Sequence, residues 1–114
     1  MAAAIFVSDP MCSWCWGMAP AIDEVVERLG DRISFDIRLG GINTDSVHPV
    51  GAYGLRRLDL LWDEVTEVTG QTFSHQLPEG TIYNSQLPCL ALEGARDITG
   101  KPPIVFTHRL QQLF

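Results

Sequence analysis

Two cysteines separated by two residues, Cys12 and Cys15, are the residues whose types and spacing can do chemistry. They follow a short apolar run and precede a stretch with helical periodicity. At the start of a helix this spacing puts both sulfurs within one turn, close enough to form a disulfide. The free N–H groups and the positive end of the helix dipole favour the thiolate, the reactive form of cysteine. The pair therefore predicts thiol–disulfide exchange, in which Cys12 attacks and Cys15 resolves the mixed disulfide.

The residues around the cysteines add apolar surface but no positive charge. Ser13 and Trp14 lie between them, and neither can lower the pKa of Cys12 as a Lys, Arg or His would. Any lowering must come mainly from the helix terminus. We expect Trp14 and Trp16 to form an apolar rim that binds peptide substrate near the sulfur. The alternative for Trp16 is packing against the helical segment further along the chain.

Two other uses of the cysteine pair compete with exchange. A zinc site needs two more ligands at usable spacing, and Cys89, His75 and His108 do not lie in a second paired motif. The pair could also be two buried thiols without chemistry. Exchange is the interpretation that a helix start after a strand favours, so we expect no metal and no bound cofactor. We expect Cys89, a lone cysteine on a helix, to be a buried free thiol.

Composition limits the remaining classes of function. The 114 residues suffice for one domain, and a net charge of −6 argues against nucleic acid or an anionic membrane as partner. No segment approaches the ~18 consecutive apolar residues of a membrane span. Residues 1–7 lack a basic region and the apolar run ends at Ser8, so we expect no signal peptide and a cytoplasmic location. Three cysteines, an odd number, also argue against a disulfide framework.

The elements that must position the cysteines form a strand–helix–strand unit. Residues 4–7 are short and apolar, as in a buried strand, and residues 12–29 repeat apolar side chains three and four apart, as in a helix. Pro20 lies inside this helix and predicts a bend there. Residues 33–39 alternate apolar and polar side chains, which indicates a strand. Short connections make this a βαβ unit with parallel strands.

The rest of the chain has helical patterns only. They cover residues 55–68, a stretch that begins near Asn84 or Ser85 and ends at Gly100, and residues 104–114. In the last helix the large apolar side chains share one side, and no segment follows to cover them. We expect that the natural domain continues or that another chain covers this side. The apolar side chains are Phe106, Leu110, Leu113 and Phe114.

The motif at residues 9–17, Asp-Pro-Met-Cys-Ser-Trp-Cys-Trp-Gly, together with Pro20, resembles the DsbA-like thioredoxin-fold family. Within that family it is most similar to the FrnE-like branch of predicted protein disulfide isomerases. The segment Tyr83-Asn84-Ser85 with Cys89 and Ala91 resembles the same branch. The resemblance implies one incomplete α/β domain over residues 1–114. Residues 1–42 would form the thioredoxin-like βαβ start and residues 50–114 the helical insertion of DsbA-type proteins, with the C-terminal half of the thioredoxin fold missing.

The resemblance implies a cytoplasmic protein disulfide oxidoreductase or isomerase with Cys12 as nucleophile and Cys15 as resolving thiol. Its substrates would be protein thiols and disulfides or small thiols, with glutathione or another thiol as redox partner. In that family a cis-proline loop faces the cysteine pair, followed by two strands and a last helix.

Two alternatives to this function remain open. One is a truncated, non-catalytic fragment that associates with another chain, for example as a homo-oligomer. The other is a relative of the kappa-class glutathione transferases and hydroxychromene carboxylate isomerases. That group is similar in architecture but has Ser in place of Cys12.

Overall fold

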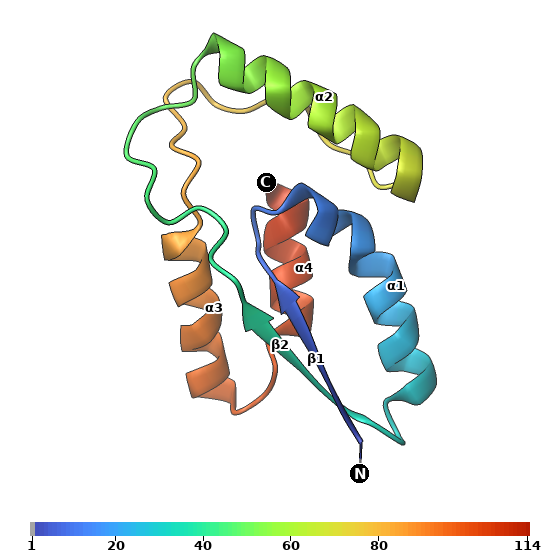
Figure 1. Cartoon of the computed structure of the whole chain (residues 1–114). Helices are drawn as coiled ribbons and strands as arrows, with labels where there is room; N and C mark the ends of the chain where they lie inside the picture. Colours follow the sequence, from blue (N-terminus) through green and yellow to red (C-terminus); the bar gives the residue numbers. More distant parts are fainter. Residues whose placement is uncertain (1) are drawn as a thin grey trace.

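The computed structural model describes residues 2–114, which form one small sheet surrounded by helices (Figure 1). In chain order the elements of this part are β1 (Ala3–Ser8), α1 (Ser13–Leu29), β2 (Ser34–Leu39), α2 (Ala52–Thr69), α3 (Gln86–Thr99) and α4 (Ile104–Leu113). The predicted helices and strands are present, with bounds that differ by a few residues at most of their ends.

The sheet confirms the predicted βαβ unit. Strands β1 and β2 pair in parallel, in a register that runs from Ala3 opposite Ser34 to Ser8 opposite Leu39. Helix α1 is the connection that parallel pairing requires. The rings of Phe6 and Phe35 stack with centroids 5.8 Å apart, and Ile37 is fully buried. The fold is therefore α/β, and both strands point toward the end of the molecule where α1 begins.

Helix α1 packs closely against α2 at Gly17, which has no side chain to separate the two helices. Gly17 faces Thr69, and a Cβ atom at position 17 would lie 2.8 Å from Thr69 Cγ2 and 3.0 Å from Val65 Cγ1. Only glycine permits this approach without displacement of α2. Pro20 lies inside α1, and the helix changes direction after its first turns (Figure 1). The first turns, which contain the cysteines, are thus held by α2.

Helix α3 covers β2 through one buried side chain and one ion pair. Leu92 is fully buried, and the Arg96 guanidinium lies 2.6 Å from the Asp36 carboxylate of β2. The opposite side of α3 exposes most of its large apolar residues, Leu87, Leu90 and Ile98. The apolar side chains predicted for this helix are therefore mostly on its solvent side, because α3 contacts the sheet through Leu92 and Arg96.

Helix α4 differs from its prediction at the end of the chain. Phe114, expected on a side without a partner, packs edge-on against Tyr83 and Trp62, with ring centroids 5.4 Å and 6.4 Å apart. The buried residues of α4 are polar, Thr107 and Gln111. Val105 and Leu113 are exposed. The residues of α4 that face the rest of the chain could not be found from apolar spacing alone.

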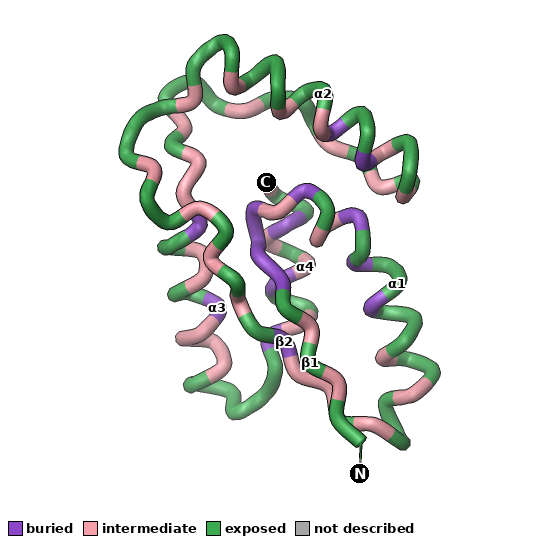
Figure 2. The backbone as a smooth tube through the Cα atoms, in the orientation of Figure 1, coloured by how far each residue is buried: buried purple, intermediate pink, exposed green. Residues whose placement is uncertain are grey.

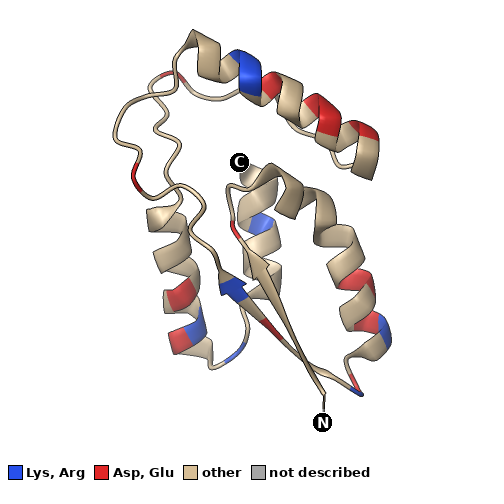
Figure 3. Cartoon of the chain, viewed as in Figure 1, with Lys and Arg blue, Asp and Glu red and all other residues tan. Residues whose placement is uncertain are grey.

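Burial and charge distinguish the start of α1 from the rest of the helices. The longest buried run of the tube passes from the end of β1 into the start of α1 (Figure 2). Lys, Arg, Asp and Glu lie mainly on α2 and on the far parts of α1 and α3, whereas the first turns of α1 carry none (Figure 3). Within residues 2–114, no helix combines the length and the apolar character that a membrane span requires.

Candidate dithiol site

Cys12 is the N-cap residue of α1, as the sequence predicts. Its backbone is extended, and the Cys15 N–H donates a hydrogen bond to the Cys12 sulfur at 3.3 Å. The N–H groups of Trp14 and Cys15 both act to lower the pKa of Cys12, because they favour its charged form. Both thiols are free and half-buried. The site therefore places two accessible sulfurs at a helix N-terminus.

The two thiols change each other's pKa values. The hydrogen bond from the Cys12 thiol, together with contributions from Ser8 and the Asp9 backbone, lowers the pKa of Cys15 to about 6 against the opposing effect of burial. The same hydrogen bond and partial burial raise the pKa of Cys12 above its ordinary value. The two thiols titrate together. The first proton therefore leaves the pair at a lower pH than from a free cysteine, and the second leaves at a higher pH. At neutral pH the pair thus carries one negative charge between its sulfurs.

A hydrogen bond from α2 fixes Ser13, one of the two residues between the cysteines. The indole N–H of Trp62, a buried residue, donates to the Ser13 hydroxyl at 3.0 Å. The Trp62 ring stacks on Phe73, with centroids 5.6 Å apart, which fixes its orientation. The helical segment after the βαβ unit therefore contacts the motif directly.

Tyr83 reaches the site from the segment before α3. Its hydroxyl donates to the carbonyl oxygen of Met11, the residue before Cys12. Burial and the negative charges of Cys12 and Asp9 raise the pKa of Tyr83 to about 12, although the Ser13 hydroxyl opposes this shift. Tyr83 is therefore a neutral hydrogen-bond donor at any physiological pH.

The fully buried carboxylate of Asp9 organises the turn between β1 and α1. Its two oxygens accept the N–H groups of Met11, at 2.8 Å, and Ile42, at 3.0 Å. The Cys89 thiol also donates to it, at 3.5 Å. Three separate segments therefore meet at this carboxylate, directly behind the cysteine pair.

The two tryptophans proposed for substrate binding have different surroundings. Trp14 is exposed beside the cysteines. The Trp16 indole N–H donates to the Thr72 carbonyl at 3.0 Å, and the Gln71 amide donates to the Trp16 carbonyl at 3.0 Å. Trp16 is thus anchored to the segment after α2, which favours the structural alternative considered for it. Substrate binding by either residue stays a prediction.

The other candidate residues have partners of their own rather than the cysteine pair. Cys89 is a half-buried free thiol whose pKa is raised by burial and by Asp9. His75 pairs with Asp59 and His108 with Asp23, each at 3.0 Å. No group of three or more His, Cys, Asp or Glu residues in the part of the chain that the structure describes is placed to hold a metal ion.

Sequence reasoning gave no role to several residues that surround the cysteines. They are Ser8, Asp9, Trp62, Tyr83 and Gln111. Asp9 and Tyr83 belong to the segments on which the family resemblance was based, so their positions carried a signal. Ser8, Trp62 and Gln111 belong to no motif in the sequence. Only the fold brings them to the site.

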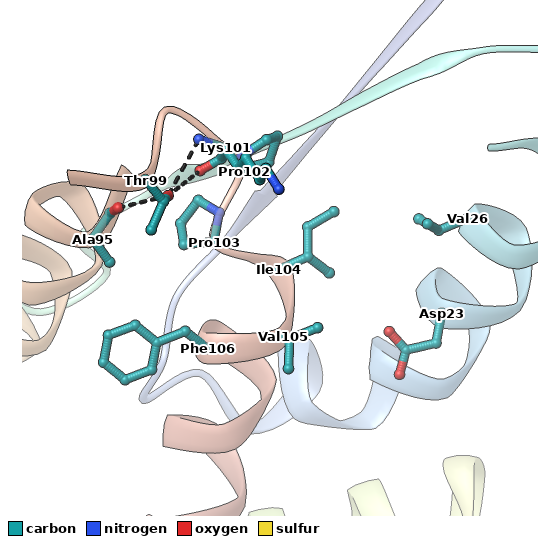
Figure 4. A pocket seen from close by; sticks show the side chains of 10 residues that line it. All are labelled: Asp23, Val26, Ala95, Thr99, Lys101, Pro102, Pro103, Ile104, Val105 and Phe106. Carbon is teal, nitrogen blue, oxygen red and sulfur yellow. Dashed lines mark hydrogen bonds between the residues drawn. The ribbon is translucent and has the colours of Figure 1, made fainter. Parts of the chain in front are cut away.

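A groove elsewhere on the molecule is not part of this site. It has a volume of about 500 Å³ and lies between α1 and the start of α4, where Val26, Ile104 and Val105 line it with Asp23 at one side (Figure 4). Its lining contains no cysteine. The cysteine pair is instead half-buried at the start of α1.

The fold that contains this site is a truncated DsbA-like thioredoxin fold. No protein-family model and no curated protein matches the sequence. Solved structures match 96% of the chain. One is a putative protein disulfide isomerase from Nitrosomonas europaea, with 32% identity and a TM-score of 0.79. Another is the cytosolic disulfide reductase DsbM from Pseudomonas aeruginosa, with 23% identity and a TM-score of 0.78.

DsbM in a structure with GSH is also similar, with 27% identity and a TM-score of 0.75. These matches cover 52%, 52% and 53% of the solved chains, respectively. The chain therefore spans about half the length of the structures that it resembles. The similarity confirms the predicted DsbA-like fold but does not distinguish its FrnE-like branch.

Proposed function

We propose that this chain carries the dithiol site of a thiol–disulfide oxidoreductase. The observation that carries the proposal is the position of Cys12 at the N-cap of α1, where its sulfur accepts the N–H of Cys15 at 3.3 Å. The similarity to a disulfide reductase and a putative disulfide isomerase supports the same class of chemistry. The finer proposal is action on protein disulfides, as an isomerase or reductase, in the cytoplasm, where DsbM is described as acting.

The reaction follows from the two thiols. The Cys12 proton passes to Cys15 as the Cys12 sulfur attacks one sulfur of a substrate disulfide. A mixed disulfide forms, and the other substrate sulfur leaves as a thiolate that takes the proton from Cys15. Cys15, as thiolate, then attacks the Cys12 sulfur. The Cys12–Cys15 disulfide forms, the second substrate thiolate leaves, and two electrons have passed from the pair to the substrate.

Glutathione is the small thiol that we propose as the redox partner. Two glutathione molecules can restore the reduced pair and leave as glutathione disulfide, which balances the cycle. The DsbM structure with GSH supports this choice. The Cys at position 12, where the kappa-class transferase group has Ser, favours exchange over the glutathione-dependent transferase alternative.

A reduction assay tests the proposal. The 114-residue chain is incubated with insulin or glutathione disulfide, and its rate is compared with those of Cys12→Ser and Cys89→Ser. We expect Cys12→Ser to lose the activity and Cys89→Ser to retain it, because only Cys12 begins the exchange. Equal rates for Cys12→Ser and the unmodified chain would contradict the proposal.

A further inference from the structure

The residues on either side of Cys12 are both held by aromatic side chains from the helical part of the chain. On one side, the indole N–H of Trp62 in α2 donates to the Ser13 hydroxyl at 3.0 Å. On the other side, the Tyr83 hydroxyl donates to the carbonyl oxygen of Met11. An indole N–H can only donate and a carbonyl can only accept, so chemistry fixes the direction of both bonds. Cys12 therefore lies between two anchored neighbours.

The two aromatic rings that supply these bonds are themselves held in place. Only 3% of Trp62 and 5% of Ser13 are exposed, so bulk water does not compete for the bond between them. The Trp62 ring stacks on Phe73. Phe114, at the end of α4, packs edge-on against both rings, with its centroid 6.4 Å from that of Trp62 and 5.4 Å from that of Tyr83. One side chain thus joins two donors that come from separate segments.

Cys12 benefits from anchored neighbours because its own side chain has to stay free to react. Its N–H donates to the Asp9 carbonyl at 3.2 Å, and its carbonyl accepts the Trp16 N–H at 3.1 Å. The Cys12 sulfur accepts the Cys15 N–H at 3.3 Å, which places it beside the residue that resolves the mixed disulfide. The first turn of a helix opens more readily than its middle. This arrangement of the sulfur therefore depends on contacts from outside the helix.

We propose that Trp62 and Tyr83 are positioning residues of the dithiol site: by holding both neighbours of Cys12, they keep its sulfur where it can close the disulfide with the resolving thiol. This inference rests on the proposed exchange function. When glutathione disulfide oxidises the pair, the Cys12–Cys15 bond forms and the glutathione S–S bond breaks. Two electrons and two protons pass from the two thiols to two glutathione molecules. Closure is intramolecular, so a turn that is already in position favours the disulfide.

The first test is amide hydrogen exchange in the reduced chain, which does not depend on thiol–disulfide exchange. Trp62→Phe and Tyr83→Phe keep an aromatic ring but lose the donor. We expect each to speed the exchange of the backbone N–H groups of residues 12–16 by roughly three- to tenfold, the value of one neutral hydrogen bond. The second half of α1 should exchange as in the unmodified chain. Ser13→Ala removes the same bond as Trp62→Phe, so it decides the role of Trp62 if Trp62→Phe does not fold.

Controls separate positioning from a general loss of stability. Tyr53→Phe removes an exposed hydroxyl in the first turn of α2 and should leave residues 12–16 unchanged. Leu92→Ala removes a fully buried side chain of α3, so it should speed hydrogen exchange across the core rather than at the start of α1. If Trp62 acts through Ser13, the double variant Trp62→Phe/Ser13→Ala behaves like either single variant.

The second test measures the equilibrium of the pair with glutathione at pH 7. We expect Trp62→Phe and Tyr83→Phe each to reduce the equilibrium constant for forming the Cys12–Cys15 disulfide by roughly three- to tenfold. The mixed disulfide of Cys12 with glutathione should accumulate in both variants, because its resolution slows, and mass spectrometry detects it. The two control variants should change neither quantity.

Unchanged hydrogen exchange at residues 12–16 in folded Trp62→Phe and Tyr83→Phe chains would overturn the inference. A shift of the glutathione equilibrium no larger than that of Leu92→Ala would also overturn it. Failure of the unmodified chain to exchange with glutathione would overturn the proposed function instead, and hydrogen exchange would still judge Trp62 and Tyr83.

Discussion

Cys15 and Cys89 make a useful comparison because both are half-buried thiols beside the same buried carboxylate, Asp9. The pKa of Cys15 is lowered to about 6, whereas that of Cys89 is raised. Burial and the negative charge of Asp9 raise the pKa in both cases, so neither of these accounts for the difference. What differs is the groups around the two sulfurs: Cys12, Ser8 and the Asp9 backbone act to lower the pKa of Cys15, whereas the Cys89 thiol itself donates to Asp9. The difference in pKa is therefore a matter of neighbouring groups, not of exposure.

The largest expected effect is a difference between the Cys12–Cys15 pair and Cys89 in the pH at which their thiols become reactive. Alkylation by iodoacetamide should rise around pH 6 for the Cys12–Cys15 pair and only above the usual range of a cysteine for Cys89, because the thiolate is the reactive form and the pKa of Cys89 is raised. Mass spectrometry of peptides alkylated between pH 5 and 10 measures both midpoints. Coincident midpoints would break the comparison.

The second prediction removes the main donor. Cys12→Ala should raise the pKa of Cys15 by about one to two units, because the hydrogen bond from Cys12 is the largest cause of its lowering. Cys12→Ser, which keeps a hydroxyl donor, should raise it by less. Thiolate absorbance measures both. An unchanged pKa in Cys12→Ala would mean that Ser8 and the backbone suffice.

The same variant changes how stability depends on pH. The folded pKa of Cys15 lies below its unfolded value, so the folded reduced chain binds fewer protons than the unfolded chain between pH 6 and 9. Its stability therefore rises with pH across this window and is lost as the pH falls through about 6. Urea unfolding at several pH values should show this slope in the reduced chain and a flatter one in Cys12→Ala.

The third prediction compares α1, the helix of Cys15, with α3, the helix of Cys89. Gly17→Ala in α1 should lower the free energy of unfolding by about 1–3 kcal/mol, because the new methyl group overlaps Thr69 and Val65 of α2. Gly94→Ala in α3, the helix of Cys89, is the control. Its new methyl group meets no atom within 4 Å, so it should raise stability by about 0.5–1 kcal/mol. Urea denaturation measures both, and equal effects would show that α1 is not held more tightly than α3.

The smallest expected effect comes from a change at Asp9, whose charge acts on both Cys15 and Cys89. Asp9→Asn should lower the pKa of Cys89 by about one unit or less and that of Cys15 by a smaller amount, because Asp9 acts on both thiols through its charge. Alkylation midpoints again provide the measurement. A rise of either pKa would show that Asp9 acts through the shape of the turn instead. Asp9→Ala is a poor substitute, since it leaves the N–H groups of Met11 and Ile42 without an acceptor.

The fold was predictable where pattern and geometry agree. The spacing of Cys12 and Cys15, the apolar repeat of α1 and the alternation of β2 each lead to one local structure, and parallel pairing follows from the length of the connection. For α3 and α4 the sequence patterns predicted the helices but not which of their sides is buried. Leu92 and Arg96 anchor α3 while its apolar stripe lies outside, and α4 turns polar residues inward because Gln111 finds partners in a turn 102 residues away. Such partners are set by tertiary packing, which local spacing does not encode.

Of the residues that form the site, the sequence predicted the two cysteines but not the residues that hold them in place. Cys12 at the helix start follows from residue type and spacing, but the groups around it come from distant segments. Trp62, Tyr83 and Gln111 have no spacing relation to the cysteines that would identify them. The roles assigned to Trp14 and Trp16 likewise depend on substrate, which sequence does not describe.

The bonds from Trp62 to Ser13, Tyr83 to Met11 and Gln111 to Ser8 span 49, 72 and 103 residues. During synthesis, which runs from the N-terminus, the cysteines leave the ribosome long before α4 does. Until α4 has emerged, the turn before the cysteines lacks the hydrogen bonds from Gln111 to Ser8 and Asp9. The nascent chain should therefore complete the contacts around its dithiol in steps, first from α2, then from Tyr83 and then from α4.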